Sequence, residues 1–133
     1  MSQFRVLIVD DNRLNTELAA FVLESDDFLV DSALDAEQAL ARLPEFRPDL
    51  ILMDIQMPGM DGLELTRRLK GDPSTRHIVI IAFTAYAMKG DELRMRQAGC
   101  DGYISKPITV ATFASTIRGF RLASNHTGEP DQR

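Results

Sequence analysis

The fold is decided by the stretch Leu50-Ile51-Leu52-Met53-Asp54, in which four consecutive apolar residues are followed by a carboxylate. A continuous apolar run of this length is typical of a strand whose two faces are both covered, as in a parallel sheet between helices. Two other runs have the same character, Val6-Leu7-Ile8-Val9 and Ile78-Val79-Ile80-Ile81-Ala82-Phe83. Weaker strand candidates are Phe28-Leu29-Val30 and Tyr103-Ile104. The sequence therefore predicts five strands.

Amphipathic segments fill the intervals between these strands. The first has apolar residues at i, i+4, i+7 and i+8, which predicts one buried helical face made of Leu14, Leu18, Phe21 and Val22. The other four helices are marked by Ala39, Leu40 and Leu43, by Leu65 and Leu69, by Leu93 and Ala98, and by Phe113, Ile117 and Phe120. Five strands alternating with five helices predict an α/β fold, a doubly wound five-stranded parallel sheet.

Local signals predict where several of these helices begin and end. Asp35 with Gln38 forms a capping pair at the start of the second helix, and Pro44 predicts its end. Gly71 and Gly99 stand just beyond the third and fourth helices, where glycine is common.

Length and charge limit the class of protein. A chain of 133 residues corresponds to one domain, which we place at residues 1–122, followed by a polar, unstructured tail at 123–133. Lys and Arg number 15 against 20 Asp and Glu, so the net charge is −5 and direct nucleic-acid binding is disfavoured. The single cysteine, Cys100, excludes an internal disulfide framework. The sequence also has no readable signal peptide and no apolar run that could cross a membrane, so we expect a cytoplasmic protein without membrane insertion.

Polar side chains follow the predicted strands at the points where ligand sites of open parallel sheets lie. Asp10 and Asp11 follow the first strand, Asp54 follows the third, Thr84 follows the fourth, and Lys106 comes soon after the fifth. Three carboxylates in one crevice repel one another unless a proton or a cation joins them. Oxygen-only ligands suit Mg²⁺ better than Zn²⁺. The arrangement therefore favours phosphoryl transfer with an aspartate as the nucleophile.

Four motifs at these positions resemble those of the CheY-like receiver domains of two-component response regulators. They are Asp10-Asp11, Asp54-Ile55-Gln56-Met57-Pro58-Gly59-Met60-Asp61-Gly62, Thr84-Ala85 and Lys106-Pro107. The resemblance covers about residues 4–122. It implies a flavodoxin-like sheet with strand order 2-1-3-4-5 and phosphorylation of Asp54 by a histidine kinase or a histidine phosphotransfer protein.

The resemblance also implies a set of Mg²⁺ ligands. Asp11 and Asp54 would bind the ion directly, Asp10 would bind it through water, and Gln56 would contribute its backbone carbonyl.

Further roles follow from the same resemblance. Lys106 would pair with the phosphoryl group and precede a cis peptide bond to Pro107. Thr84 would hydrogen-bond the phosphoryl group, and Tyr103 would turn inward when Thr84 moves. Gln56 and Tyr86 would border the path of the water that removes the phosphoryl group.

The resemblance suggests a single-domain response regulator that signals by protein contact, of the cell-cycle type or of the type found as receivers in hybrid kinases, with a chemotaxis role also open. The expected output surface consists of the fourth helix, the fifth strand and the fifth helix. Self-phosphorylation from small phosphodonors and slow autodephosphorylation would be its only chemistry.

Three alternatives remain. A haloacid-dehalogenase-like phosphatase also uses Asp, Thr, Lys and Mg²⁺, but Asp10-Asp11-Asn12-Arg13 lacks the acid two residues after the nucleophile. A flavodoxin-like flavin carrier needs a phosphate-binding loop after the first strand, where Asp10-Asp11 has the wrong charge. The chain could also be a receiver excised from a hybrid histidine kinase.

Overall fold

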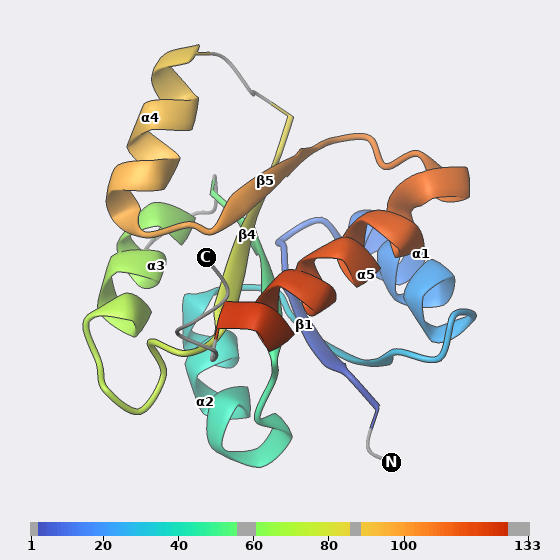
Figure 1. Ribbon diagram of the computed structural model, residues 1–133, viewed down its shortest axis with the longest axis horizontal. Helices are drawn as coiled ribbons and strands as arrows, with labels where there is room; N and C mark the ends of the chain where they lie inside the picture. Colours follow the sequence, from blue (N-terminus) through green and yellow to red (C-terminus); the bar gives the residue numbers. More distant parts are fainter. Residues whose placement is uncertain (1–2, 56–60, 86–88, 128–133) are drawn as a thin grey trace.

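The chain folds as a five-stranded parallel sheet covered by helices on both faces (Figure 1). The structure, a computed structural model, describes residues 3–55, 61–85 and 89–127. The strands are β1 (Arg5–Val9), β2 (Leu29–Ala33), β3 (Leu50–Asp54), β4 (Val79–Thr84) and β5 (Gly102–Ser105). Their order is β2-β1-β3-β4-β5, and every neighbouring pair is parallel. The predicted fold class and strand order are confirmed.

Five helices connect the strands. They are α1 (Arg13–Glu24), α2 (Ala36–Phe46), α3 (Gly62–Lys70), α4 (Lys89–Ala98) and α5 (Val110–Thr127). Helices α1 and α5 lie together on one face, whereas α2, α3 and α4 lie on the other (Figure 1). Each face has its own core, which explains why β1, β3 and β4 have continuous apolar runs.

Side-chain caps determine where three helices begin. The Asn12 side chain accepts from the Asn15 N–H at 3.1 Å, and Asp61 accepts from the Glu64 N–H at 2.8 Å. Asp35 accepts from the Gln38 N–H at 2.8 Å, so the predicted capping pair is confirmed. These caps satisfy N–H groups that the helices themselves cannot pair.

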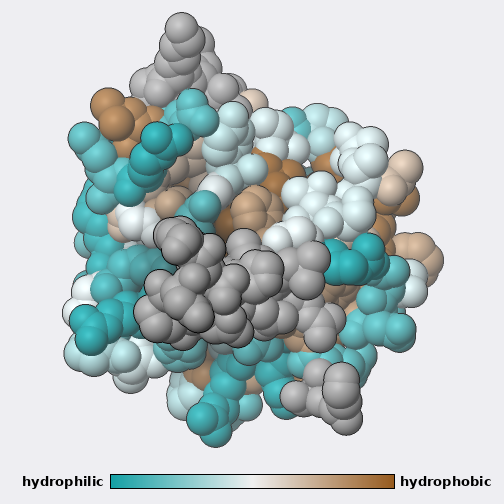
Figure 2. All heavy atoms as spheres, in the orientation of Figure 1, coloured by the Kyte–Doolittle hydropathy of each residue, from teal (hydrophilic) through white to brown (hydrophobic). Residues whose placement is uncertain are grey.

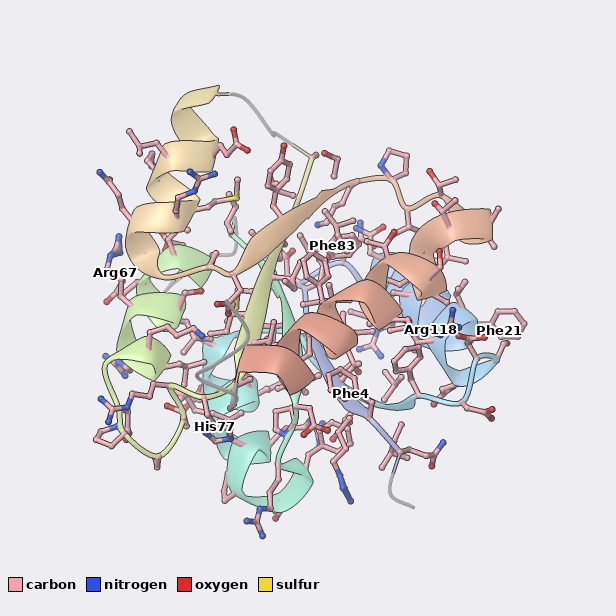
Figure 3. The ribbon with its side chains drawn as sticks, in the orientation of Figure 1. Phe4, Phe21, Arg67, His77, Phe83 and Arg118 are labelled. Carbon is pink, nitrogen blue, oxygen red and sulfur yellow. The ribbon has the colours of Figure 1, made fainter. Side chains whose placement is uncertain are left out.

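The predicted buried face of α1 is wrong for Leu14, Leu18 and Phe21, and right for Val22. Leu14 is 76% exposed and Phe21 is 69% exposed, and Figure 3 shows Phe21 pointing outward from the helix. The sheet-facing side instead contains Thr16, Ala19, Val22 and Leu23. Two of these residues, Thr16 and Ala19, are small and let the helix approach β1 closely, and the Thr16 hydroxyl donates to the Arg13 carbonyl at 2.7 Å. Apolar periodicity found a stripe on α1, but not the one that packs.

The packing of α4 agrees with the prediction at Ala98 and differs from it at Leu93. Leu93 is 58% exposed, whereas Met95 and Ala98 are buried against Ile55 and Leu63. The packing therefore uses a methionine, whose flexible side chain fills irregular space well.

Two predicted helix ends require correction. Pro44 does not end α2, which continues to Phe46, because a proline in the last turn keeps a helical φ. The helix stops at Arg47, which has φ 55° and whose N–H donates to the Leu43 carbonyl at 2.9 Å. Helix α5 runs to Thr127, into the segment predicted as tail, and no glycine or proline lies between Gly119 and Gly128 to end it earlier. Among the described residues, no helix is long and apolar enough to cross a membrane.

Candidate functional site

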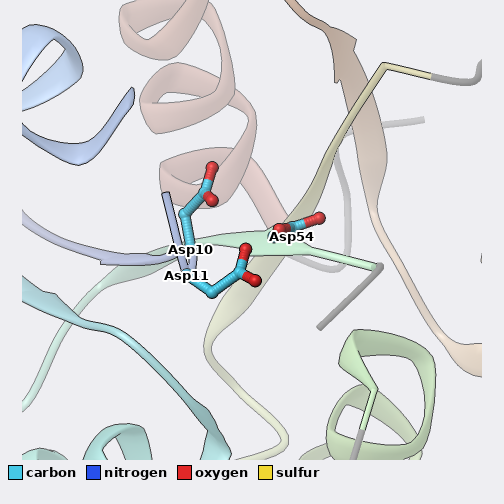
Figure 4. A group of neighbouring side chains, drawn as sticks. All are labelled: Asp10, Asp11 and Asp54. Carbon is cyan, nitrogen blue, oxygen red and sulfur yellow. The ribbon is translucent and has the colours of Figure 1, made fainter. Parts of the chain in front are cut away.

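Three aspartates meet at the carboxyl edge of the sheet (Figure 4). Asp10 and Asp11 follow β1 and Asp54 ends β3, so adjacent parallel strands bring them together. One carboxylate oxygen from each lies within 4.8 Å of the others. Asp10 and Asp54 are buried, whereas Asp11 is exposed. Close like charges of this kind repel one another unless a proton or a cation compensates them.

Lys106 supplies part of that compensation. Its Nζ lies 2.8 Å from Oδ2 of Asp10 and 3.6 Å from Oδ2 of Asp54. The Lys106 N–H donates to the Thr84 carbonyl at 2.8 Å, which ties the loop after β5 to the end of β4. The peptide bond between Lys106 and Pro107 is cis. With one ammonium against three carboxylates, the site keeps a net negative charge.

Two asparagines that the sequence reasoning did not assign to the site contact Asp10. The Asn12 N–H donates to Oδ1 of Asp10 at 2.8 Å. The Asn15 side-chain amide lies 3.5 Å from Oδ2 of the same carboxylate. The sequence feature that could have predicted these contacts is the position of Asn12 as the N-cap of α1, which places the first turn of the helix over the Asp10 carboxylate. Asp10 therefore has its hydrogen-bonding capacity largely filled by the protein.

Gly62 positions the backbone that carries Asp54. A β-carbon placed on Gly62 would lie 2.8 Å from the carbonyl carbon of Asp54 and from the Cα of Ile55, and nearer still to the Asp54 carbonyl oxygen. Only a residue without a side chain permits this approach. The first turn of α3 thus packs directly against the end of β3.

Two predicted switch residues lie on neighbouring strands. Thr84 ends β4 and is buried, whereas Tyr103 lies in β5 and is 39% exposed. Thr84 pairs in register with Ser105, and Tyr103 pairs with Ala82. Gln56 and Tyr86, predicted to border the phosphoryl group, lie outside the described residues.

The acid cluster, the lysine and the strand order agree with a family comparison. Residues 6–118 match the family model for the response regulator receiver domain. The chain belongs to this family. The receiver domain of this chain thus consists of a five-stranded parallel sheet that carries three clustered aspartates and a facing lysine.

Similar proteins agree with the family assignment. The chain is 50% identical over 115 residues to the polar-differentiation response regulator DivK of Brucella anthropi, covering 86% of this chain and 94% of the relative. A CheY-like receiver domain protein from Methanospirillum hungatei is similar in structure, with a TM-score of 0.85, 28% identity and coverage of 95% and 99% of the two chains. The receiver domain of a histidine kinase from Syntrophus aciditrophicus has a TM-score of 0.79 at 32% identity, covering 98% and 95% of the two chains. This receiver is therefore a two-component signalling protein, and the phosphatase and flavin-carrier alternatives are not favoured.

Proposed function

We propose that the chain accepts a phosphoryl group on Asp54 from a phosphohistidine and signals through phosphorylation-dependent contact with another protein. One observation carries the proposal: a buried carboxylate at the end of the central strand lies 3.6 Å from a lysine that also holds a second buried carboxylate. The donor is a histidine kinase or a histidine phosphotransfer protein, as receiver-family membership implies.

The transfer is a displacement at phosphorus. An Oδ atom of Asp54 forms the new O–P bond while the N–P bond of the phosphohistidine breaks, and its electron pair remains on the imidazole nitrogen. Lys106 can stabilise the negative charge of the transferred phosphoryl group, because its Nζ lies near both Asp10 and Asp54 and can pair with a phosphoryl oxygen. The Thr84 hydroxyl, from the adjacent strand, donates a hydrogen bond to the phosphoryl group.

The donor set fits Mg²⁺, which receiver domains typically bind at acidic residues. Three carboxylates whose oxygens lie within 4.8 Å form a hard, oxygen-only cluster, and one of them is open to solvent. Asp11 and Asp54 would hold the ion directly, Asp10 through water, and Gln56 through its carbonyl. When bound, such an ion would supply positive charge to offset that of the carboxylates and of the incoming phosphoryl oxygens.

The proposed output is the face formed by α4, β5 and α5. Thr84 is linked to Lys106 by the 2.8 Å hydrogen bond, and β4 pairs with β5 along the register that includes Tyr103. A cavity of about 220 Å³ between α4 and β5 is lined in part by Met95 and Tyr103. Space beside an exposed aromatic ring is what a rearrangement of Tyr103 toward the interior needs. Phosphorylation at Asp54 can therefore bias this face between two arrangements.

The signal ends by hydrolysis of the acyl phosphate. Gln56 and Tyr86 would border the incoming water, and the bulk of Tyr86 would slow its approach. The protein is thus a phosphoacceptor with slow autodephosphorylation rather than an enzyme acting on other substrates. We place its action in the cytoplasm, where histidine kinases present their phosphohistidines.

Intact mass spectrometry tests the acceptor. The parent protein, incubated with Mg²⁺ and acetyl phosphate, should gain one phosphoryl group, and the Asp54→Asn protein should gain none. Asp61→Asn is the matched control, because Asn retains the cap of α3 and leaves Asp54 intact. This control should gain the phosphoryl group as the parent does. Phosphorylation of Asp54→Asn at the parental yield would refute the assignment.

A further inference from the structure

A second cavity lies at the opposite edge of the sheet from the aspartates. It has a volume of about 480 Å³ and lies between the end of α2 and the loop that joins α3 to β4. Its lining consists of Leu43, Pro44, Arg47, Pro48, Asp49, Ser74, Thr75, His77 and Ile78. Cavities that hold small organic molecules have volumes in this range and a mixture of apolar walls and few polar groups. The proposed phosphorylation function uses none of these residues.

The walls of this cavity are fixed by the backbone. Pro44 and Pro48 have restricted φ angles, and the Arg47 N–H donates to the Leu43 carbonyl at 2.9 Å. On the other side, the Thr75 hydroxyl donates to the Leu69 carbonyl at 2.7 Å, and the Ile78 N–H donates to the Thr75 carbonyl at 3.0 Å. A cavity held open in this way demands little ordering of the protein when a ligand enters.

Some hydrogen-bond donors of the cavity lining have partners within the described part of the protein, and others do not. The hydroxyl of Ser74 donates to Asp72 at 2.8 Å, and that of Thr75 donates to a carbonyl, so their protons are taken. The side chains of Arg47 and His77 make no hydrogen bond or ion pair with any other residue that the structure describes. His77 lies low in Figure 3, in the same region as α2. The cavity therefore presents a free guanidinium and a free imidazole.

The acceptors of the lining are also defined. Oδ2 of Asp49 accepts the Arg5 N–H at 2.8 Å, which turns that oxygen toward β1 and leaves Oδ1 for another donor. A purely anionic ligand would meet Asp49 unfavourably. A ligand that carries both an acid and a hydrogen-bond donor would satisfy Arg47 and Asp49 together.

We propose that this cavity binds a small organic acid with an apolar side chain and one amide donor, the size of an acylated amino acid. Its carboxylate pairs with the guanidinium of Arg47 and accepts a hydrogen bond from His77. Its amide N–H donates to Asp49. The apolar side chain packs against Leu43 and Ile78.

A pair of probes that differ only in charge tests the proposal. The ¹⁵N-labelled full chain is titrated with N-acetyl-L-leucine and, separately, with its neutral amide, and amide shifts are followed by NMR. The acid should shift residues 43–49 and 74–78 saturably and bind about tenfold more tightly than the neutral amide, the difference expected for one charge-assisted pair. The Arg47→Asn protein should lose that preference, and asparagine suits the left-handed backbone at this position.

Arg76→Gln is the matched control, because Arg76 lies in the same loop but does not line the cavity. It should keep the tenfold preference, which separates a specific pair from general attraction to a basic surface. Equal affinity for both probes, an unchanged preference in Arg47→Asn, or absence of shifts at these residues up to about 10 mM would overturn the proposal. The phosphoryl mass gained at Asp54 is measured independently and does not depend on the result.

Discussion

The close approach of α3 to the end of β3 makes Gly62→Ala a decisive perturbation. The new methyl carbon would lie 2.8 Å from the Asp54 carbonyl carbon and from the Ile55 Cα. Carbon atoms pack best at about 3.5–4.0 Å, so the two backbones must separate by about 1 Å. Neither contact is the end of a flexible side chain that could rotate away. The helix, the strand end, or both must move.

We expect a large loss of stability from this change. Overpacking a well-filled site usually costs about 1–3 kcal/mol, and a clash with backbone belongs at the upper end of that range. For a domain of this size, about 3 kcal/mol corresponds to a fall in Tm of about 10 °C. Because the displaced backbone also carries Asp54, phosphorylation should slow by about 100-fold below the new Tm, as expected for a reactive group misplaced by about 1 Å.

The assay combines thermal unfolding with the rate of mass gain from acetyl phosphate. Gly119→Ala is the control, since a β-carbon there meets nothing within 4 Å and the residue lies within α5. Alanine should stabilise that helix by about 1 kcal/mol and leave phosphorylation unchanged. A Gly62→Ala protein with parental Tm and parental phosphorylation rate would refute the packing argument.

Other predictions concern single side chains. Asp11→Asn should raise the Tm of the metal-free protein, because it removes an exposed charge next to two other carboxylates. Asp10→Asn should lower the Tm, because Asp10 is buried in an ion pair with Lys106. A higher Tm for Asp10→Asn than for Asp11→Asn in calorimetry would contradict this. Burial raises the pKa of the Cys100 thiol, so thiolate-dependent alkylation at pH 8 should be slower in the native protein than in urea, and equal rates would contradict it. Tyr86→Ala should shorten the lifetime of the phosphorylated state measured by intact mass; an unchanged lifetime would show that Tyr86 does not shield the site.

The fold class could be predicted from the sequence because its central strands are apolar throughout. Runs such as Leu50–Met53 are buried on both faces, so their position in the sheet can be inferred without knowing the helices. The strand ends then predict which polar residues meet, and Asp10 and Asp54 do lie together. Strand order came from the family resemblance, since short parallel strands do not specify their neighbours.

The buried faces of the helices were harder to predict from the sequence. On α1, the stripe containing Leu14 and Phe21 is more apolar than the stripe containing Thr16 and Ala19, yet the second one packs against the sheet. Periodicity detects a stripe but does not decide which of two overlapping stripes approaches β1, because close approach favours small side chains. The sequence also did not predict the ion pair between Lys106 and Asp10. This pair depends on the path of the loop after β5, which periodicity does not describe.

The surroundings of the three aspartates differ, and the differences bear on the separate roles that the family resemblance implies for them. Asp10 is fully buried and receives hydrogen bonds from the Asn12 N–H and from Lys106, so its lone pairs are occupied by donors fixed in the protein. Asp11 is exposed, and its charge is free to attract a cation from solvent. Asp54 is buried on the central strand, and its Oδ2 lies 3.6 Å from Nζ of Lys106, a distance longer than a hydrogen bond. Removal from water strengthens electrostatic interactions at Asp54, and the longer distance leaves Lys106 able to pair with an incoming phosphoryl oxygen. These differences support the proposal that Asp54 is the nucleophile and that Asp11 is a direct cation ligand, and they add a second role for Asp10, whose carboxylate holds Lys106 in place.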